Sequence, residues 1–201
     1  ANTEGTNNTA VGDAALGSAT TASYNVGIGR MALGVNTTGY QNVAVGTFAA
    51  DANTTGASNT AIGYAALTDT TTGAENTAVG GYALQLNTTA GANTAVGYGA
   101  SATGTTGSYN TAIGYLAMRY GTTAHQNVCV GYLAGEDLTT SQNNTLVGYT
   151  TGRNITTGDS NTAMGHNSFV ANTTGGNNTI IGINAAYQAD GGDNNTCIGS
   201  G

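Results

Sequence analysis

A short apolar segment recurs along the chain at one fixed interval. The segment is Asn-(Thr/Val)-x-(aliphatic)-Gly, and each copy begins 17 residues after the previous one. Its asparagines are Asn8, Asn25, Asn42, Asn59, Asn76, Asn93, Asn110, Asn127, Asn144, Asn161, Asn178 and Asn195. A glycine follows each of them four residues later, from Gly12 to Gly199. The consensus, numbered from this asparagine as position 1, is NTAVGYxALxxNTTGxx.

A repeat of this length predicts an all-β parallel β-solenoid or β-roll. Helical repeats are about twice as long and need an apolar stripe of period 3.6, and Thr, Val, Asn and Gly favour helices poorly. Rungs of a solenoid stack about 4.8 Å apart, so an inserted residue would break the columns. We therefore expect one domain over residues 1–201, built from about twelve rungs and roughly 57 Å long.

The Asn-Thr-Ala-Val-Gly segment is the expected strand of each rung. Residues two apart share a face of a strand, so positions 2 and 4 point one way and the alanine of position 3 points the other. We expect the Val or Ile of position 4 to form the core with the Leu of position 9. The alanine column is then the expected contact face for a second subunit, and the glycine of position 5 supplies an unusual backbone angle.

Each rung has few apolar side chains to bury, and this indicates that the chain associates with other copies. One aliphatic residue, one Leu or Ala and some Thr per rung hardly offset chain entropy of 1–2 kcal/mol per residue. Ladders of stacked Asn and Thr side chains and burial against other copies are the remaining sources of stability. The sequence thus predicts a homo-oligomer, either a trimer or a filament.

The motif of residues 59–63 and 110–114 resembles the S-V-A-I-G repeat of trimeric autotransporter adhesin heads. It is also similar to N-T-A-I-G-Y repeats of phage tail fibres and bacterial surface proteins, and the resemblance covers the whole chain. It implies a left-handed parallel β-roll, three chains wide, that binds host matrix. The rung is longer here than in the adhesins, and no coiled-coil stalk lies within these residues, so the resemblance bears on the fold more than on the partner.

The composition of the chain argues against two classes of partner, nucleic acids and anionic membranes. The chain has 3 basic residues, all Arg, against 10 acidic ones, for a net charge of −7. Nucleic-acid binding needs clustered basic residues, and anionic membranes attract basic segments, so neither partner is expected. No apolar run approaches the roughly 20 residues of a membrane span. The chain starts at Ala1 without a signal peptide, which indicates a processed protein or an excerpt, and we expect an extracellular or virion-surface location.

Catalytic constellations are not apparent in the sequence. His125 and His166 occupy different columns and lack a Ser-Asp or Cys partner at a suitable offset. The acidic residues scatter, so a carboxylate pair for glycan cleavage is not expected. Asp190 and Asp193 form a weak candidate for Ca²⁺. We predict no catalytic residues and no cofactor.

Aromatic residues provide the best candidate for binding. Tyr64, Tyr98, Tyr115, Tyr132 and Tyr149 all occupy position 6. Such a stripe can bind sugar rings or a protein partner. It can also be a ladder that only stiffens the stack, and this second interpretation is favoured.

Two further columns carry specific expectations. Cys129 and Cys197 share position 3 four rungs apart, about 19 Å at strand spacing, which is too far for a disulfide; copies of them could meet across an oligomer axis lined by the alanine column. Positions 13 and 14 form adjacent Thr files, from Thr20 and Thr21 to Thr173 and Thr174. Only one file can face outward, which makes ice binding a minor alternative.

These observations favour a structural or adhesive fibre module that presents a repetitive surface. A subunit of a head-to-tail filament is the alternative. An ice-binding protein and a glycan-cleaving tailspike are less favoured.

Overall fold

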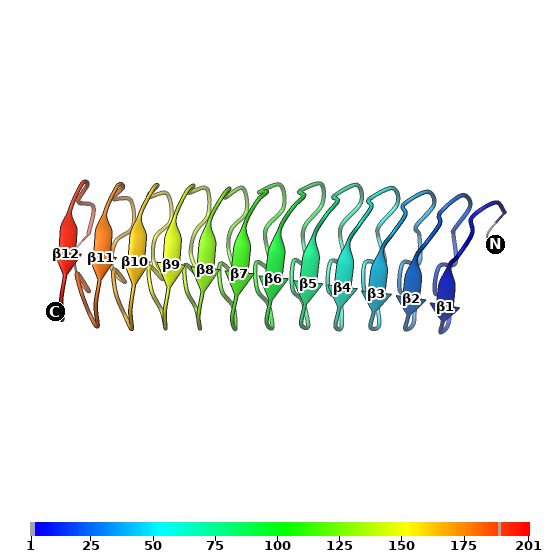
Figure 1. The fold of residues 1–201 in the computed structure, drawn as a ribbon, viewed down its shortest axis with the longest axis horizontal. Coiled ribbons are helices and arrows are strands. Elements are labelled where there is room, and N and C mark those ends of the chain that lie inside the picture. Colours follow the sequence, from blue (N-terminus) through cyan, green and yellow to red (C-terminus); the bar gives the residue numbers. More distant parts are fainter. Residues whose placement is uncertain (1–2, 189) are drawn as a thin grey trace.

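The protein is a parallel β-solenoid in which every rung contributes one short strand. The computed structural model describes residues 3–188 and 190–201. The chain winds from one end of a rod to the other, and its strands lie side by side in chain order (Figure 1). The strands are β1 (Thr9–Val11), β2 (Val26–Ile28), β3 (Val43–Val45), β4 (Thr60–Ile62), β5 (Thr77–Val79), β6 (Thr94–Val96), β7 (Thr111–Ile113), β8 (Val128–Val130), β9 (Thr145–Val147), β10 (Thr162–Met164), β11 (Thr179–Ile181) and β12 (Thr196–Ile198).

The predicted register is confirmed throughout. Each strand residue pairs with the residue 17 positions later, so Thr60 faces Thr77 and Ile62 faces Val79. We number the rungs with their strands, rung 1 beginning at Asn8. In the described part of the chain, no helix is long and apolar enough to span a membrane.

A ladder of buried asparagine side chains runs through position 1. In rung 7, the Asn110 Nδ2 donates to the Oδ1 of Asn93 at 3.1 Å and to the carbonyl of Ala124 at 2.7 Å. The Oδ1 of Asn110 accepts the backbone N–H of Asn127 at 3.0 Å. The same backbone-to-side-chain bond links every consecutive pair from Asn8 to Asn195. The amide therefore ties each rung to both of its neighbours.

The expected assignment of the two strand faces is wrong. The middle residue of the strand points into the roll: position 3 is at most 1 % exposed in rungs 3 to 11, from Ala44 to Ile180. The aliphatic residues of position 4 point outward, as Ile28, Ile62 and Ile113 show with 38–39 % exposure. The alanine column is core, and it is not available to contact a second subunit.

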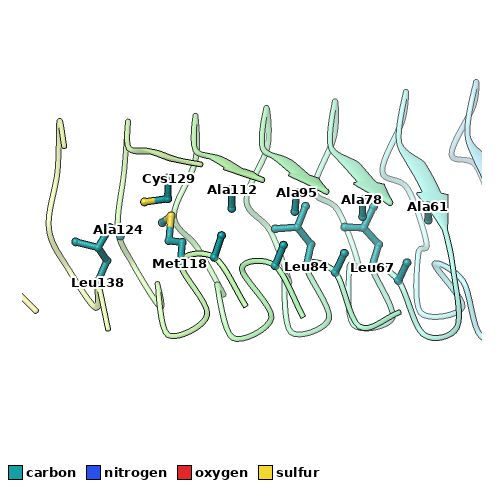
Figure 2. Packing of buried hydrophobic residues seen from close by; sticks show 14 of the residues in the cluster. Ala61, Leu67, Ala78, Leu84, Ala95, Ala112, Met118, Ala124, Cys129 and Leu138 are labelled. Atoms are coloured by element: carbon teal, nitrogen blue, oxygen red, sulfur yellow. The ribbon is translucent and has the colours of Figure 1, made fainter. Parts of the chain in front are cut away.

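The short distance between the two walls of the roll explains this inversion. At Gly27, which replaces alanine in β2, a Cβ atom would lie 3.0 Å from the carbonyl oxygen of Ala32 and 3.3 Å from the Cγ of Leu16. Position 3 thus faces positions 8 and 9, and Figure 2 shows the strand alanines pointing toward Leu67 and Leu84. Because the opposite wall is so close, alanine fits and a branched side chain fits only where the wall recedes.

Rungs 8 and 9 show how the core keeps its volume. Position 9 is Gly135 and Gly152 there, where rungs 1, 2, 4 and 5 carry Leu, and position 12 becomes Leu138 and Ile155. A Cβ on Gly152 would come within 3.0 Å of Leu146 and Ile155, so these larger side chains fill the vacated space. The large residue has moved to another position of the same rung.

The corners need left-handed backbone. Every glycine of position 5 has φ between 128° and 141°, which confirms the expected role of that column. Positions 7, 9 and 17 are also left-handed, with φ of 48° to 63° at side-chain-bearing residues such as Leu67 and Glu75. Non-glycine residues in this region cost about 1 kcal/mol or more each, so contacts between the rungs must hold these corners in place.

The two Thr files divide as predicted. The hydroxyls of position 13 donate to the next rung's backbone, as in Thr54 Oγ1 to the Thr71 carbonyl at 2.9 Å. The file of position 14, including Thr55 and Thr106, is exposed.

Adjacent residues of β7 test which face is core. Ala112→Leu should lower the free energy of unfolding by about 1–3 kcal/mol, because an overfilled core must shift its neighbours. In samples diluted until the chain is monomeric, Ile113→Thr, on the outward side, should change it by less than about 0.5 kcal/mol. Urea unfolding of the two variants measures both values, and a larger loss for Ile113→Thr would contradict the inward alanine column.

Candidate functional site

A continuous ladder of aromatic rings runs along one corner of the roll. It begins at Phe48 and ends at His166, and neighbouring ring centroids are 4.9–6.1 Å apart. Its members are Phe48, Tyr64, Tyr82, Tyr98, Tyr115, Tyr132, Tyr149 and His166. The structure thus brings together all five tyrosines named from the sequence. The guanidinium of Arg30 lies 5.1 Å from the Phe48 centroid and extends the series by one rung.

Three members of the ladder escaped the sequence reasoning. Position 6 is Thr47 in rung 3 and Gly81 in rung 5, and in both rungs the next residue supplies the ring, Phe48 or Tyr82. His166 occupies position 6 and stacks on Tyr149 with 6° between the ring planes. The substitution of position 7 for position 6 is visible in the sequence once the two columns are examined together.

The ladder uses most of its ring faces internally. From Tyr98 to His166 the planes of successive rings differ by 6–13°, so each inner ring is stacked between two others. The tyrosines remain 42–52 % exposed and turn their edges to solvent. Parallel, offset stacking is a favourable arrangement of rings, and this geometry favours stiffening of the rod over stacking of sugars along these rungs.

Tyr132→Ala tests the contribution of the ladder to stability. It removes two stacked contacts, so the free energy of unfolding should fall by about 1–3 kcal/mol, and the near-ultraviolet circular dichroism of the stacked rings should weaken. Tyr40→Ala removes a tyrosine of similar exposure outside the ladder, 53 % against 42 % for Tyr132, and is the control. Equal losses in both variants would show that the stack adds nothing beyond an exposed ring.

A hollow interrupts the corner beside Tyr82. It has a volume of about 220 Å³ and is open to solvent. Its floor is Gly99 and Ala102 of rung 6, the small members of positions 7 and 10. Rungs 5 and 7 carry full-sized side chains in these positions and form the walls. The lining residues are Tyr82, Gln85, Tyr98, Gly99, Ala102, Leu116 and Arg119.

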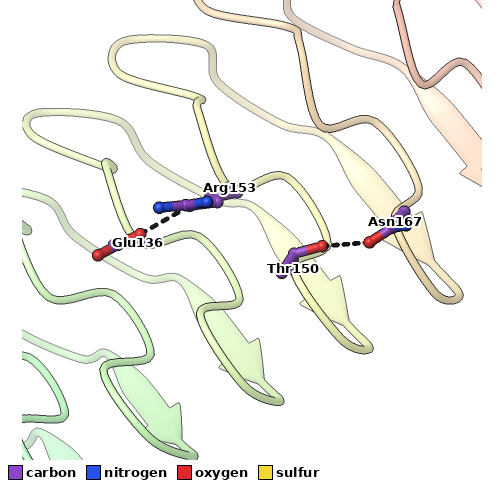
Figure 3. Close-up of polar contacts among 4 residues, drawn as sticks. All are labelled: Glu136, Thr150, Arg153 and Asn167. Carbon is purple, nitrogen blue, oxygen red and sulfur yellow. Dashed lines mark hydrogen bonds and ion pairs between the residues drawn. The ribbon is translucent and has the colours of Figure 1, made fainter.

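Charged side chains gather in position 10 next to this hollow. The Nε of Arg153 donates to the Oε2 of the buried Glu136 at 2.8 Å (Figure 3), while Thr150 and Asn167 are joined one corner away. Burial, and then the charge of Glu136, raise the pKa of the neighbouring Asp137. Arg119 lies 4.8 Å from the Tyr120 centroid. Among the described residues, no carboxylate is within ion-pair distance of it.

The carboxyl of Asp51, also in position 10, is partly buried, and its hydrogen bonds do not fully offset the loss of water. Burial has the largest effect and raises the pKa of its carboxyl. The hydrogen bond from the Ala52 backbone N–H lowers the pKa by a smaller amount, and the charge of Asp69 raises it again. Its Oδ1 is buried without a hydrogen-bond partner in the described part of the chain. Because the pKa is higher in the folded state, ionised Asp51 destabilises the fold above its unfolded-state pKa, and protonation relieves this as the pH falls.

Asp51→Asn should therefore raise the urea midpoint at pH 7. The gain should shrink on acidification and vanish below about pH 4, where the unfolded state is also protonated. Midpoints measured from pH 3 to 7 test this, with the exposed Glu75→Gln as control. A gain that is independent of pH, or no gain at pH 7, would show that the ionised carboxyl is not the cause.

The other candidate groups have structural partners. His125 accepts the backbone N–H of Ser108 through Nδ1 at 3.2 Å. The carboxylates of Asp190 and Asp193 accept backbone N–H groups of Thr173 and Gly176 in the preceding rung. No group of three or more metal-ligating side chains occurs within residues 3–188 and 190–201.

The cysteines are free and share one column, on β8 and β12. Cys129 is completely buried inside the roll, and burial raises the pKa of its thiol strongly. The expectation that such cysteines could meet across an oligomer axis is wrong, because position 3 points into the roll.

The outward side of the strands forms a second candidate surface, here termed the sheet face. It consists of the position 2 and position 4 side chains of β1 to β12. Position 2 is Thr in nine strands and Val in three, and position 4 is Val, Ile or Met in all twelve. The largest exposed position 4 residues include Ile62, Ile113, Met164 and Ile181 at 37–47 %. A flat stripe of aliphatic and Thr side chains thus runs along the whole rod.

A larger hollow of about 500 Å³ lies near the last rungs, lined by Asn167, Asn184, Ala186, Tyr187, Gln188 and Gly201. It contains no charged side chain.

Comparison of the chain with models of protein families, with curated proteins and with solved structures finds no match.

Proposed function

We infer that the protein is a non-enzymatic structural or adhesive fibre module that works as a homo-oligomer outside the cell or on a virion. The observation that carries this proposal is the sheet face. It carries in every rung an aliphatic residue that is exposed or half-buried. At about 4.8 Å per rung and a width of about 10 Å, it covers roughly 600 Å². The aliphatic column and its Thr methyl groups form a stripe along this area, and exposed apolar patches of a few hundred Å² on soluble proteins often mark interaction sites.

A second copy of the chain is the partner that fits this face best. The sheet face is straight, periodic and uncharged, and an identical face repeats the same spacing. The resemblance of the motif to adhesin heads points to the same arrangement, with three chains around an axis. Packing the sheet faces together would bury the Val and Ile residues that the thin roll leaves outside.

A head-to-tail filament is the second candidate. Consecutive rungs pair in one regular parallel register along the whole rod, and the same pairing between the rungs of two copies would form a filament. In this arrangement the sheet face would remain exposed along the filament.

Glu substitutions on the sheet face separate these possibilities. Val96→Glu combined with Ile113→Glu places charges in the proposed contact, whereas Thr106→Glu with Thr123→Glu adds the same charge to the exposed Thr file. The wild type and the Thr variant should show one discrete multiple of the 19.7 kDa chain mass by light scattering. The Val/Ile variant should be monomeric, with unchanged far-ultraviolet circular dichroism, because buried unpaired charges oppose association.

Other outcomes overturn the proposal. A wild type that is monomeric at high micromolar concentration would refute self-association. Fibres of variable length that both double variants still form would favour the filament. Thermal hysteresis in the wild type would favour an ice-binding surface, and turnover of a glycan would refute the non-enzymatic assignment.

A further inference from the structure

The hollow over Gly99 lies where the sequence of rungs 5 and 6 departs from the regular pattern of this corner. In rung 6 the aromatic ring is Tyr98 at position 6, and position 7 is glycine; in rung 5 the order is reversed, with Gly81 followed by Tyr82. This exchange turns the Tyr82 ring roughly perpendicular to Tyr64 and Tyr98, with interplanar angles of 74° and 78°. The hollow therefore lies where the parallel stacking of the ladder has not yet begun.

The walls of the hollow stand two rungs apart, about 9.6 Å at strand spacing. Tyr82 and Gln85 lie on the rung 5 side, and Leu116 and Arg119 lie on the rung 7 side. A Cβ at Gly99 would lie 2.5 Å from the Cδ2 of Leu116, so a side chain there would displace Leu116 and occupy the hollow. At about 220 Å³ the space is below the 300–1,000 Å³ of sites for drug-sized ligands, so it suits a single ring.

The chemistry of the lining is that of a carbohydrate subsite. Aromatic and aliphatic side chains can contact the C–H groups of a pyranose, and an amide at the rim can bond its hydroxyls. The site is shallow and solvent-open, which suits a polar ring better than an apolar ligand.

The charge of Arg119 indicates which class of sugar the hollow would bind. The chain has only three cations, and two of them are paired with carboxylates: Arg30 with Asp13 and Arg153 with Glu136. Arg119 is the remaining one, and within the described residues it lacks such a partner. A guanidinium binds a carboxylate through two parallel hydrogen bonds, so the ligand should bring the carboxylate that the protein does not supply.

We propose that the hollow formed by Tyr82, Gln85, Gly99, Ala102, Leu116 and Arg119 binds one pyranose unit that carries a carboxylate, such as a hexuronic acid within a surface polysaccharide. Tyr82 and Leu116 contact the ring, Arg119 binds the carboxylate, and Gln85 bonds a hydroxyl. The site deepens the adhesive part of the proposed function and rests on it. These six residues occupy positions 7 and 10, so packing of the sheet face leaves them outside the proposed contact.

Calorimetric titration of the full chain at low salt tests the site. The probes are trigalacturonic acid and its fully methyl-esterified form, which is uncharged. The acid should bind at least about tenfold more tightly than the ester, and Arg119→Gln should reduce the affinity for the acid to that for the ester. Arg30→Gln makes the same change of charge far from the hollow and should leave the affinity unchanged. Ala102→Leu fills the floor and should weaken both probes at least tenfold.

Several results would overturn the site. These are equal binding of acid and ester, equal effects of Arg119→Gln and Arg30→Gln, and no binding of either probe at millimolar concentration. Tighter binding of acetylated tetraglutamate than of both sugars would assign the hollow to an acidic peptide. Far-ultraviolet circular dichroism checks that each variant folds, and Arg119→Gln, a surface change, keeps the test decisive if Ala102→Leu does not fold.

Light scattering of the same samples separates this proposal from the proposed function. If the oligomer is intact but no sugar binds, only the carbohydrate site is refuted. If the chain is a monomer that still binds the acid, only the proposed self-association is refuted.

Discussion

The buried amide of position 1 is the interaction on which the rest of the structure depends. From Asn25 to Asn178, each asparagine donates to the rung before it and accepts from the rung after it, in a site closed to water. A buried polar group without its partners costs about 1–3 kcal/mol, so a rung that is one residue too long or too short would lose bonds in two neighbours. Aspartate lacks the donor and glutamine displaces the amide by one methylene. The constant length of 17 residues is the length that returns the chain to this amide.

Once the rungs are held in register, the remaining features follow from a very flat cross-section. The walls are close enough that alanine faces alanine, and the chain must reverse direction within a few residues. Left-handed backbone at four positions of each rung accomplishes these reversals. Since rungs contact only their neighbours, stability is close to a sum of repeated terms. A small unfavourable contribution at each corner is offset by hydrogen bonds and ring contacts between rungs.

The sequence predicts the strands, the register and the role of the position 5 glycine, because these depend on spacing alone. It does not reveal which side of the strand is inside. Alternation shows that Thr60 and Ile62 share a face, but hydrophobicity favours the isoleucine for the core, and only the distance to the opposite wall decides for Ala61. The stripe of five tyrosines was predicted from one column, whereas Phe48 and Tyr82 reach the ladder from the next. The hollow is harder still to foresee, since it arises from side chains that are missing in Gly99 and Ala102.

The exchange of core volume in rungs 8 and 9 has a consequence for how such a gene can change. Equal rungs invite unequal recombination, which adds or removes 51 nucleotides, three for each of the 17 residues. A crossover between positions 13 and 17 moves whole rungs and preserves every filled core. A crossover between positions 3 and 9 would join Leu146 of rung 9 to Phe169 of rung 10 and overfill the hybrid, or join Ala163 to Gly152 and leave its core underfilled. The fold thus permits changes of length throughout the rod, while the core of each rung must be inherited as a block.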